Sequence, residues 1–274
     1  MAVRSSISCW SALLVLAATL VAAPPTTQAA QADRCVAVFF RGFGASVGTS
    51  GMDNLEAHLV AAFGGNPARP FSSAVFNWTD QQQAFDFING FTDIGCLVLA
   101  GHSFGANATI ELTTDFLMPA GIPVDLLVQF DSVGANDNVL PAGVAQGYNY
   151  HQVSTGGFFE PQGEMTVQGS TNVYVENDYN VFDSDITHTQ IDCPLFERTP
   201  ADYAALFGSQ PDLYARVESH VAVLYVAEAV PALGLPGIAA LILTVLASAG
   251  RAMQRPGPGR SPVALMGPGC GNAL

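Results

Sequence analysis

The stretch "CLVLAGHSFGANATIEL", residues 96–112, decides the fold. A run of apolar strand formers ends at Gly101, Ser103 follows between two glycines, and a helical pattern begins at once. A strand that runs directly into such a turn, with a helix leaving directly from it, lifts the serine hydroxyl clear of a sheet. The small residues Gly101, Gly105 and Ala106 let strand and helix approach closely. The stretch therefore predicts a nucleophilic Ser103, with an ordinary strand-to-helix turn as the alternative.

A second match to the same Gly-x-Ser-x-Gly pattern shows why context matters. Residues 44–48, "GASVG", place Ser46 between two glycines. The preceding strand pattern ends near Phe40, however, and the next helical pattern begins only after Gly51. Ser46 therefore lacks the direct strand and helix that a nucleophile requires.

Apolar strand patterns and helical patterns alternate along most of the chain. Strands are expected over residues 35–40, 71–78, 96–101, 124–132, 148–153 and 171–177, and helices over 52–63, 80–90 and 106–117 and from about 199. The strands are almost continuously apolar, which is typical of a parallel sheet covered on both faces. The sequence predicts an α/β fold with a minimal, mostly parallel sheet and helices on both faces.

The segment "LVLAGHSFGAN", residues 97–107, within this β/α order resembles the α/β-hydrolase superfamily, in its serine esterase, lipase and thioesterase-like branch. The resemblance covers residues 35–195. It implies a triad in the chain order Ser, acid, His and an oxyanion hole from the loop after the first strand. It also implies hydrolysis of a small-molecule or lipid acyl ester or thioester, without cofactor or metal. The alternatives are an acyltransferase with the same triad and a non-catalytic cell-surface binding module on this scaffold.

The superfamily's general base belongs in the loop after the last strand, and His188 lies there in "DSDITHTQID", residues 183–192. His58 precedes the serine and falls on a helical pattern. His102 adjoins Ser103 and is expected to point away from it. His151 and His220 fall in a strand pattern and an apolar helix. We therefore expect His188 to be the base, with a surface loop histidine as the alternative.

The acid is assigned to Asp131, which ends the strand after the serine helix. More members of the superfamily carry the acid after the next strand, where this chain offers only Glu160 and Glu164. Asp137 is a further candidate, as are the loop acids Asp178, Asp183 and Asp185.

The oxyanion hole is expected to use the backbone N–H groups of Phe104 and Phe43. Phe43 lies between Gly42 and Gly44 in the loop after the first strand, which allows a close backbone approach. The alternative is a plain Gly-rich connection. Trp78 ends the second strand at the same edge, where it lines the site or fills the core.

The charge balance excludes one class of partner. The chain has a net charge of −14, with 23 acidic residues, nine arginines and no lysine. Nucleic-acid binding needs Lys or Arg to neutralise phosphates, so no nucleic-acid partner is expected. At 274 residues the chain is long enough for one sizeable core.

The segments at both ends of the sequence are predicted to lie outside the hydrolase domain. Arg4, the apolar residues 11–23 and the small residues that follow predict a signal peptide over residues 1–32 and therefore an exported protein, either secreted or held at the cell surface. The hydrolase domain is expected over residues 33–229. Residues 230–250 carry no charge and are long enough for a membrane-anchoring helix, with a docked apolar helix as the alternative. Residues 251–274 are expected to be a disordered tail.

Export permits disulfides among the cysteines that remain after cleavage. In the superfamily, the strands that Cys35 and Cys96 open are neighbours, and both cysteines then fall at the edge opposite the serine. We expect a Cys35–Cys96 disulfide, with two buried thiols as the alternative. The cysteine spacing fits no zinc motif.

Overall fold

The computed structural model describes residues 33–43, 50–67, 69–135, 137–153, 163–174, 186–196 and 198–227. The predicted signal peptide, the candidate anchor at 230–250 and the tail at 251–274 lie outside these residues. None of the helices in the described ranges combines the length and the hydropathy needed to cross a membrane.

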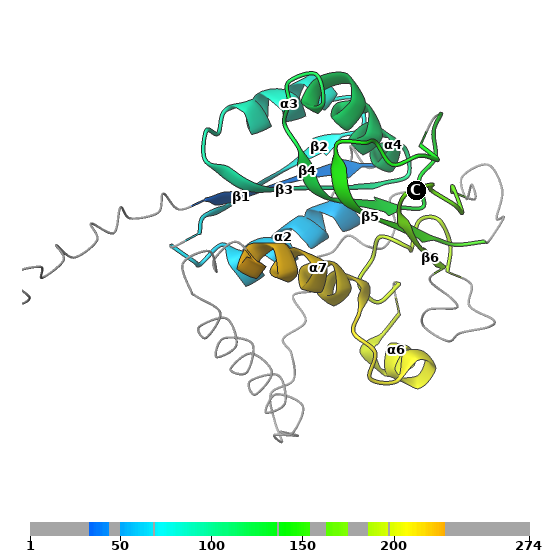
Figure 1. Ribbon diagram of the computed structural model, residues 1–274. Coiled ribbons are helices and arrows are strands. Elements are labelled where there is room, and N and C mark those ends of the chain that lie inside the picture. The colour runs from blue at the N-terminus through cyan, green and yellow to red at the C-terminus, as the bar shows by residue number, and fades with distance from the viewer. Residues whose placement is uncertain are drawn as a thin grey trace, which may run out of the picture. The chain divides into compact units, whose positions relative to one another are not determined.

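A six-stranded parallel sheet forms the centre of the fold (Figure 1). Its strands are β1 (Arg34–Arg41), β2 (Phe71–Asn77), β3 (Ile94–His102), β4 (Val124–Phe130), β5 (Val144–His151) and β6 (Thr171–Tyr174), in the spatial order β2-β1-β3-β4-β5-β6. The chain passes from β1 to β2 on one side and then returns to place β3 on the other side. Such a reversal of direction leaves a crevice at the carboxyl ends of the strands, where α/β proteins bind ligands.

Helices cover both faces of the sheet, as the apolar strand patterns predict (Figure 1). They are α2 (Gly51–Phe63), α3 (Gln81–Asn89), α4 (Phe104–Glu111), α6 (Pro200–Phe207) and α7 (Leu213–Ala227). Successive residues of β1 point to opposite faces, so Ala37 and Phe39 belong to the core cluster that includes residues of α2, α6 and α7, while Val36 and Val38 belong to the cluster that includes residues of α3 and α4. The predicted α/β fold class is confirmed.

The helix expected over residues 106–117 changes its winding halfway. The α-helical turns end at Glu111, and a π-helical segment, η1, spans Leu112–Leu117. Thr113 Oγ1 donates to the carbonyl of Thr109 at 2.7 Å, and Thr109 Oγ1 donates to the carbonyl of Ala106 at 2.7 Å. Threonine hydroxyls that bond back to the preceding turn compete with the helical ladder, and the helix widens where they do.

The predicted disulfide closes the amino-terminal edge of the sheet. Cys35 of β1 lies directly opposite Cys96 of β3 in the strand register, their Cα atoms are 4.5 Å apart, and the two sulfurs are bonded. This bond lies at the opposite end of the strands from Ser103, so it stabilises the scaffold without entering the site.

Candidate active site

Ser103 occupies a strained turn between β3 and α4. Its backbone has φ 56° and ψ −127°, a conformation that a residue with a side chain adopts only when the surroundings enforce it. The enforcement comes from close packing of small residues. A Cβ at Gly101 would overlap the backbone of Gly105, and a Cβ at Gly105 would overlap the carbonyl oxygen of Phe40. Both glycines of the motif are therefore required by geometry.

Asp131 leaves the neighbouring strand at the same level as Ser103. His102 is paired with Phe130 in the register of β3 and β4, and the Ser103 N–H donates to the Phe130 carbonyl at 3.0 Å. Asp131 follows Phe130 with φ 47°, and its side chain is fully buried. The two strands thus deliver a serine and a carboxylate side by side at the carboxyl edge of the sheet.

Four donors hold the Asp131 carboxylate in place. Oδ1 accepts from the backbone N–H groups of Gly163, at 3.1 Å, and Gln152, at 3.3 Å. Oδ2 accepts from Gln152 Nε2 at 2.8 Å and from His188 Nδ1 at 2.6 Å. The backbone of Gly163 can approach because it has no side chain: a Cβ there would lie 2.5 Å from Oδ1. A buried carboxylate with this many donors is fully satisfied.

His188 reaches Asp131 from residues 186–196, a segment of turns and irregular backbone. Ile186, Ile191 and Phe196 are completely buried and fix this segment on the α2 and α7 side of the sheet. Because a carboxylate accepts, the Nδ1–H of His188 donates to Asp131, which leaves Nε2 as the basic nitrogen. The described hydrogen bonds of Ser103 and His188 do not include one between their side chains, a contact that in other enzymes often tightens only around substrate.

The other candidate acids lie apart from this pair or outside the described residues. Asp137 is buried and accepts from Ser132 Oγ at 2.5 Å. Glu164 accepts the N–H of Thr166 at 3.4 Å. The candidate acids Glu160, Asp178, Asp183 and Asp185 lie outside the described residues, and so does Ser46 of the second Gly-x-Ser-x-Gly motif.

The remaining histidines lie on the elements expected from the sequence. His58 of α2 pairs with Glu218 of α7 at 2.8 Å, His220 of α7 lies 3.1 Å from the Tyr150 hydroxyl, and His151 ends β5. His102 is the exception to the sequence prediction in one respect. The sequence assigns its side chain no role, but in the structure this side chain contacts the segment that carries His188.

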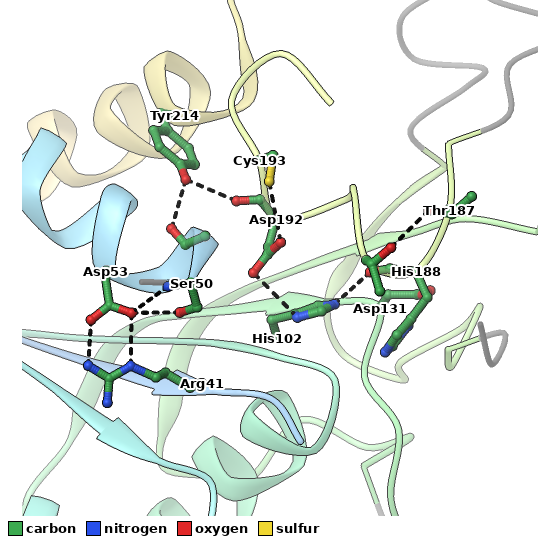
Figure 2. A network of polar contacts seen from close by, with 12 residues as sticks. Arg41, Ser50, Asp53, His102, Asp131, Thr187, His188, Asp192, Cys193 and Tyr214 are labelled. Carbon is green, nitrogen blue, oxygen red and sulfur yellow. Dashed lines mark hydrogen bonds and ion pairs between the residues drawn. The ribbon is translucent and has the colours of Figure 1, made fainter. Parts of the chain in front are cut away.

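Two residues that the sequence analysis assigned no role thus join the site. His102 Nε2 lies 2.7 Å from the backbone oxygen of His188, and His102 Nδ1 lies 3.3 Å from Asp192 Oδ2 (Figure 2). Burial lowers the pKa of His102 and raises the pKa of Asp192, because each charged form loses its hydration. No local pattern could have linked two residues that stand 90 positions apart.

Both residues predicted to supply oxyanion-hole N–H groups are next to residues at the serine turn: Phe104 follows Ser103, and Phe43 follows Gly42. Phe104 is the first residue of α4, where N–H groups have no acceptor within the helix and the helix dipole favours negative charge. Gly42 lies against the serine, since a Cβ there would be 3.0 Å from Ser103 Cβ, and Phe43 follows it. The oxyanion hole itself stays a prediction, since it requires both N–H groups to point at one oxygen.

One carboxylate fastens both ends of the loop that contains Phe43. Asp53 accepts from Arg41 Nε at 2.8 Å and also from Arg41 Nη2. It accepts as well from the N–H and the hydroxyl of Ser50, each at 2.8 Å (Figure 2). Arg41 ends β1 and Ser50 caps α2, so this network fixes the entrance and the exit of the loop.

Aromatic side chains gather beside the serine. Phe43 is 68% exposed, and its ring centre lies 6.3 Å from that of Phe104, which in turn lies 5.3 Å from that of the partly buried Trp78. Trp78 therefore contacts the elbow and also packs on the core behind it. These rings offer apolar surface to the part of a ligand that lies next to Ser103.

The strand order, the strained Gly-x-Ser-x-Gly turn and the Asp131–His188 pair are compatible with the predicted α/β-hydrolase fold. No family model and no curated protein matches the chain. Among solved structures, it is similar to a cutinase-like protein from Cryptococcus sp., at 20% identity and a TM-score of 0.24. That match covers 43% of this chain and spans about half, 52%, of the other.

Proposed function

We propose that this protein is an exported serine hydrolase that cleaves a carboxylic ester or thioester through an acyl-Ser103 intermediate. The observation that carries the proposal is a serine in a strained strand-to-helix turn, beside a fully buried aspartate that holds a histidine at 2.6 Å. Strain and burial of this kind are concentrated at functional sites rather than at ordinary turns. The Cys35–Cys96 disulfide supports export, because such bonds persist in oxidising compartments.

Each residue then has a defined part in the reaction. His188 Nε2 removes the proton from Ser103 Oγ as the oxygen attacks the acyl carbon, and Asp131 stabilises the imidazolium that forms. The N–H groups of Phe104 and Phe43 donate to the oxyanion. His188 then gives its proton to the departing alcohol or thiol. Water, deprotonated by the same histidine, releases the acid and restores the serine.

The test combines a chromogenic ester with a covalent probe. The mature protein is expected to hydrolyse short-chain p-nitrophenyl esters and to react with a fluorophosphonate, and Ser103→Ala is expected to lower kcat by about 10⁴ or more. The matched control is Ser46→Ala, at the other Gly-x-Ser-x-Gly motif, which should keep both activities. Equal labelling of the Ser103→Ala variant would refute the assignment.

The same assay separates the hydrolase from its two rivals. A binding module on this scaffold would leave both the ester and the probe unreacted. An acyltransferase would form the acyl-enzyme but release it faster when an alcohol acceptor is added, and the mixture would then contain new ester in place of free acid.

A further inference from the structure

A second acid–histidine pair lies beside the first and takes no part in the proposed chemistry. His102 and Asp192 have side chains that are only 11% and 6% exposed. The rings of His102 and His188 lie 4.7 Å apart, and His102 Nε2 bonds the main chain of His188 rather than its ring. Buried titratable groups in such a position call for an explanation of what they do.

One hydrogen bond and one ion-pair contact indicate where the protons of this pair lie. A carbonyl oxygen only accepts, so His102 Nε2 carries a proton and donates it to the backbone oxygen of His188. Asp192 Oδ2 forms an ion-pair contact with His102 Nδ1 at 3.3 Å, and because an ionised carboxylate only accepts, this contact is favourable when a second proton lies on the ring or on the carboxyl group. With this shared proton the pair carries no net charge, which suits its burial beside Asp131, Asp53 and His188.

The scaffold holds Asp192 from two helices. Its carboxylate lies against Gly51, the first residue of α2, where a Cβ would overlap it. Negative charge is stabilised at that end of a helix. The Asp192 carbonyl accepts from the Tyr214 hydroxyl of α7 at 3.0 Å, and the same hydroxyl lies 2.7 Å from the Gly51 carbonyl (Figure 2). These contacts fix the position of Asp192, and Asp192 in turn fixes the ring of His102.

We propose that His102, fixed by Asp192, is a positioning residue that holds the main chain of His188 while Asp131 holds its ring. The proposal rests on the proposed function, in which His188 is the general base. His188 lies in a segment of turns, where no helix or strand ladder sets the position of its backbone. A bond to the carbonyl and a bond to Nδ1 fix the residue at two ends and leave Nε2 for Ser103.

The proposal predicts that the donor at His102 matters for turnover and little for substrate binding. In His102→Leu, which removes the donor, kcat for p-nitrophenyl butyrate should fall about 10- to 100-fold, since small displacements of a catalytic group cost this much, while KM stays within about threefold. His102→Gln keeps an N–H donor at the position of Nε2 and should recover most of kcat. His58→Leu, the matched control, removes a histidine of α2 and should leave kcat unchanged.

A spectroscopic signature makes the test independent of activity. The Nδ1 proton of His188, bonded to Asp131 at 2.6 Å, should give a low-field proton NMR signal that disappears in His188→Ala. This signal should shift or broaden in His102→Leu and return in His102→Gln. If ester hydrolysis is absent while the signal still responds in this way, the proposed function fails and the positioning role stands.

Two results would overturn the positioning role. One is a His102→Leu variant with unchanged kcat and an unchanged low-field signal. The other is a His102→Gln variant as impaired as His102→Leu, which would mean that ring packing matters and the donor does not. If His102→Leu fails to fold, Asp192→Asn and Asp192→Leu give the same comparison, because an asparagine N–H can donate to a neutral Nδ1 and leucine cannot.

Discussion

Replacing Asp131 with asparagine should stop catalysis while leaving most of the fold's stability. Two of the four donors to the carboxylate are backbone N–H groups, of Gly163 and Gln152, and neither can turn round. The asparagine oxygen must therefore face them, and its NH₂ group must face Gln152 Nε2 and His188 Nδ1. The Gln152 amide can flip to present its oxygen, and the histidine can adopt its other tautomer.

The tautomer is the reason for the loss of activity. When His188 Nδ1 accepts from the asparagine, the ring proton moves to Nε2, which then cannot accept the proton of Ser103. The expected fall in kcat is about 10⁴, the size of effect that a triad held in the wrong tautomer produces. The expected loss of unfolding free energy is about 1–2 kcal/mol, because charge-assisted bonds become neutral ones while each group that faces residue 131 keeps a partner there.

The measurement compares Asp131→Asn with Asp137→Asn in the p-nitrophenyl ester assay and in urea unfolding. Asp137 was the rival acid by sequence and is equally buried, but it accepts from Ser132 rather than from a histidine. Its variant should keep kcat within about fivefold. The reasoning is refuted if Asp131→Asn loses less than tenfold in kcat, or if Asp137→Asn loses as much as Asp131→Asn.

Three further changes test the scaffold under the site. Gly105→Ala should lower the unfolding free energy by about 1–3 kcal/mol and should also lower kcat, because the added Cβ meets backbone atoms. Gly65→Ala, the control, should be neutral because nothing lies within 4 Å of the added Cβ. If the two variants had the same melting temperature, the prediction would be wrong. Replacing Cys35 and Cys96 together by alanine opens a loop of 61 residues and should cost about 4 kcal/mol in urea unfolding, with a loss under about 1 kcal/mol counting against it. Burial raises the pKa of Asp53, but the bonds from Arg41 and Ser50 outweigh it and hold that pKa below its ordinary 3.8. The stability lost in Asp53→Asn should therefore be complete well above pH 3.8 and shrink as the pH falls below it, and a loss independent of pH would exclude this.

The strained turn at Ser103 could be predicted because most of what shapes it is local. Gly101, Gly105 and the strained backbone of Ser103 all lie within five residues, and the strand and helix on either side are strongly patterned. The same reasoning separated Ser103 from Ser46, whose neighbourhood carries the motif without the strand and helix. The parallel sheet was predictable for a similar reason, since short, continuously apolar strands are typical of a parallel sheet that is buried on both faces.

The placements of Asp131 and of the His102–Asp192 pair depend on contacts that no local pattern records. Asp131 and Asp137 stand six residues apart in one connection, and only the three-dimensional contacts show that Asp131 faces His188 while Asp137 accepts from Ser132. Asp192 looks like a loop charge in the sequence. Its role depends on how the segment after His188 returns to the start of α2, and such long-range returns are set by the packing of the whole domain.

The ends of β3 and β4 show how the fold sustains the site. Each strand is followed directly by a non-glycine residue with positive φ, Ser103 at 56° and Asp131 at 47°, a conformation that costs of the order of 1–3 kcal/mol for each residue. Each of these N–H groups donates back into the next strand, Ser103 to Phe130 at 3.0 Å and Asp131 to Tyr150 at 2.7 Å. Because the sheet bonds continue through the strained residues, the ladder itself opposes relaxation of the turns. Two neighbouring strands use the same device at the same level, and this is why their side chains leave the sheet together.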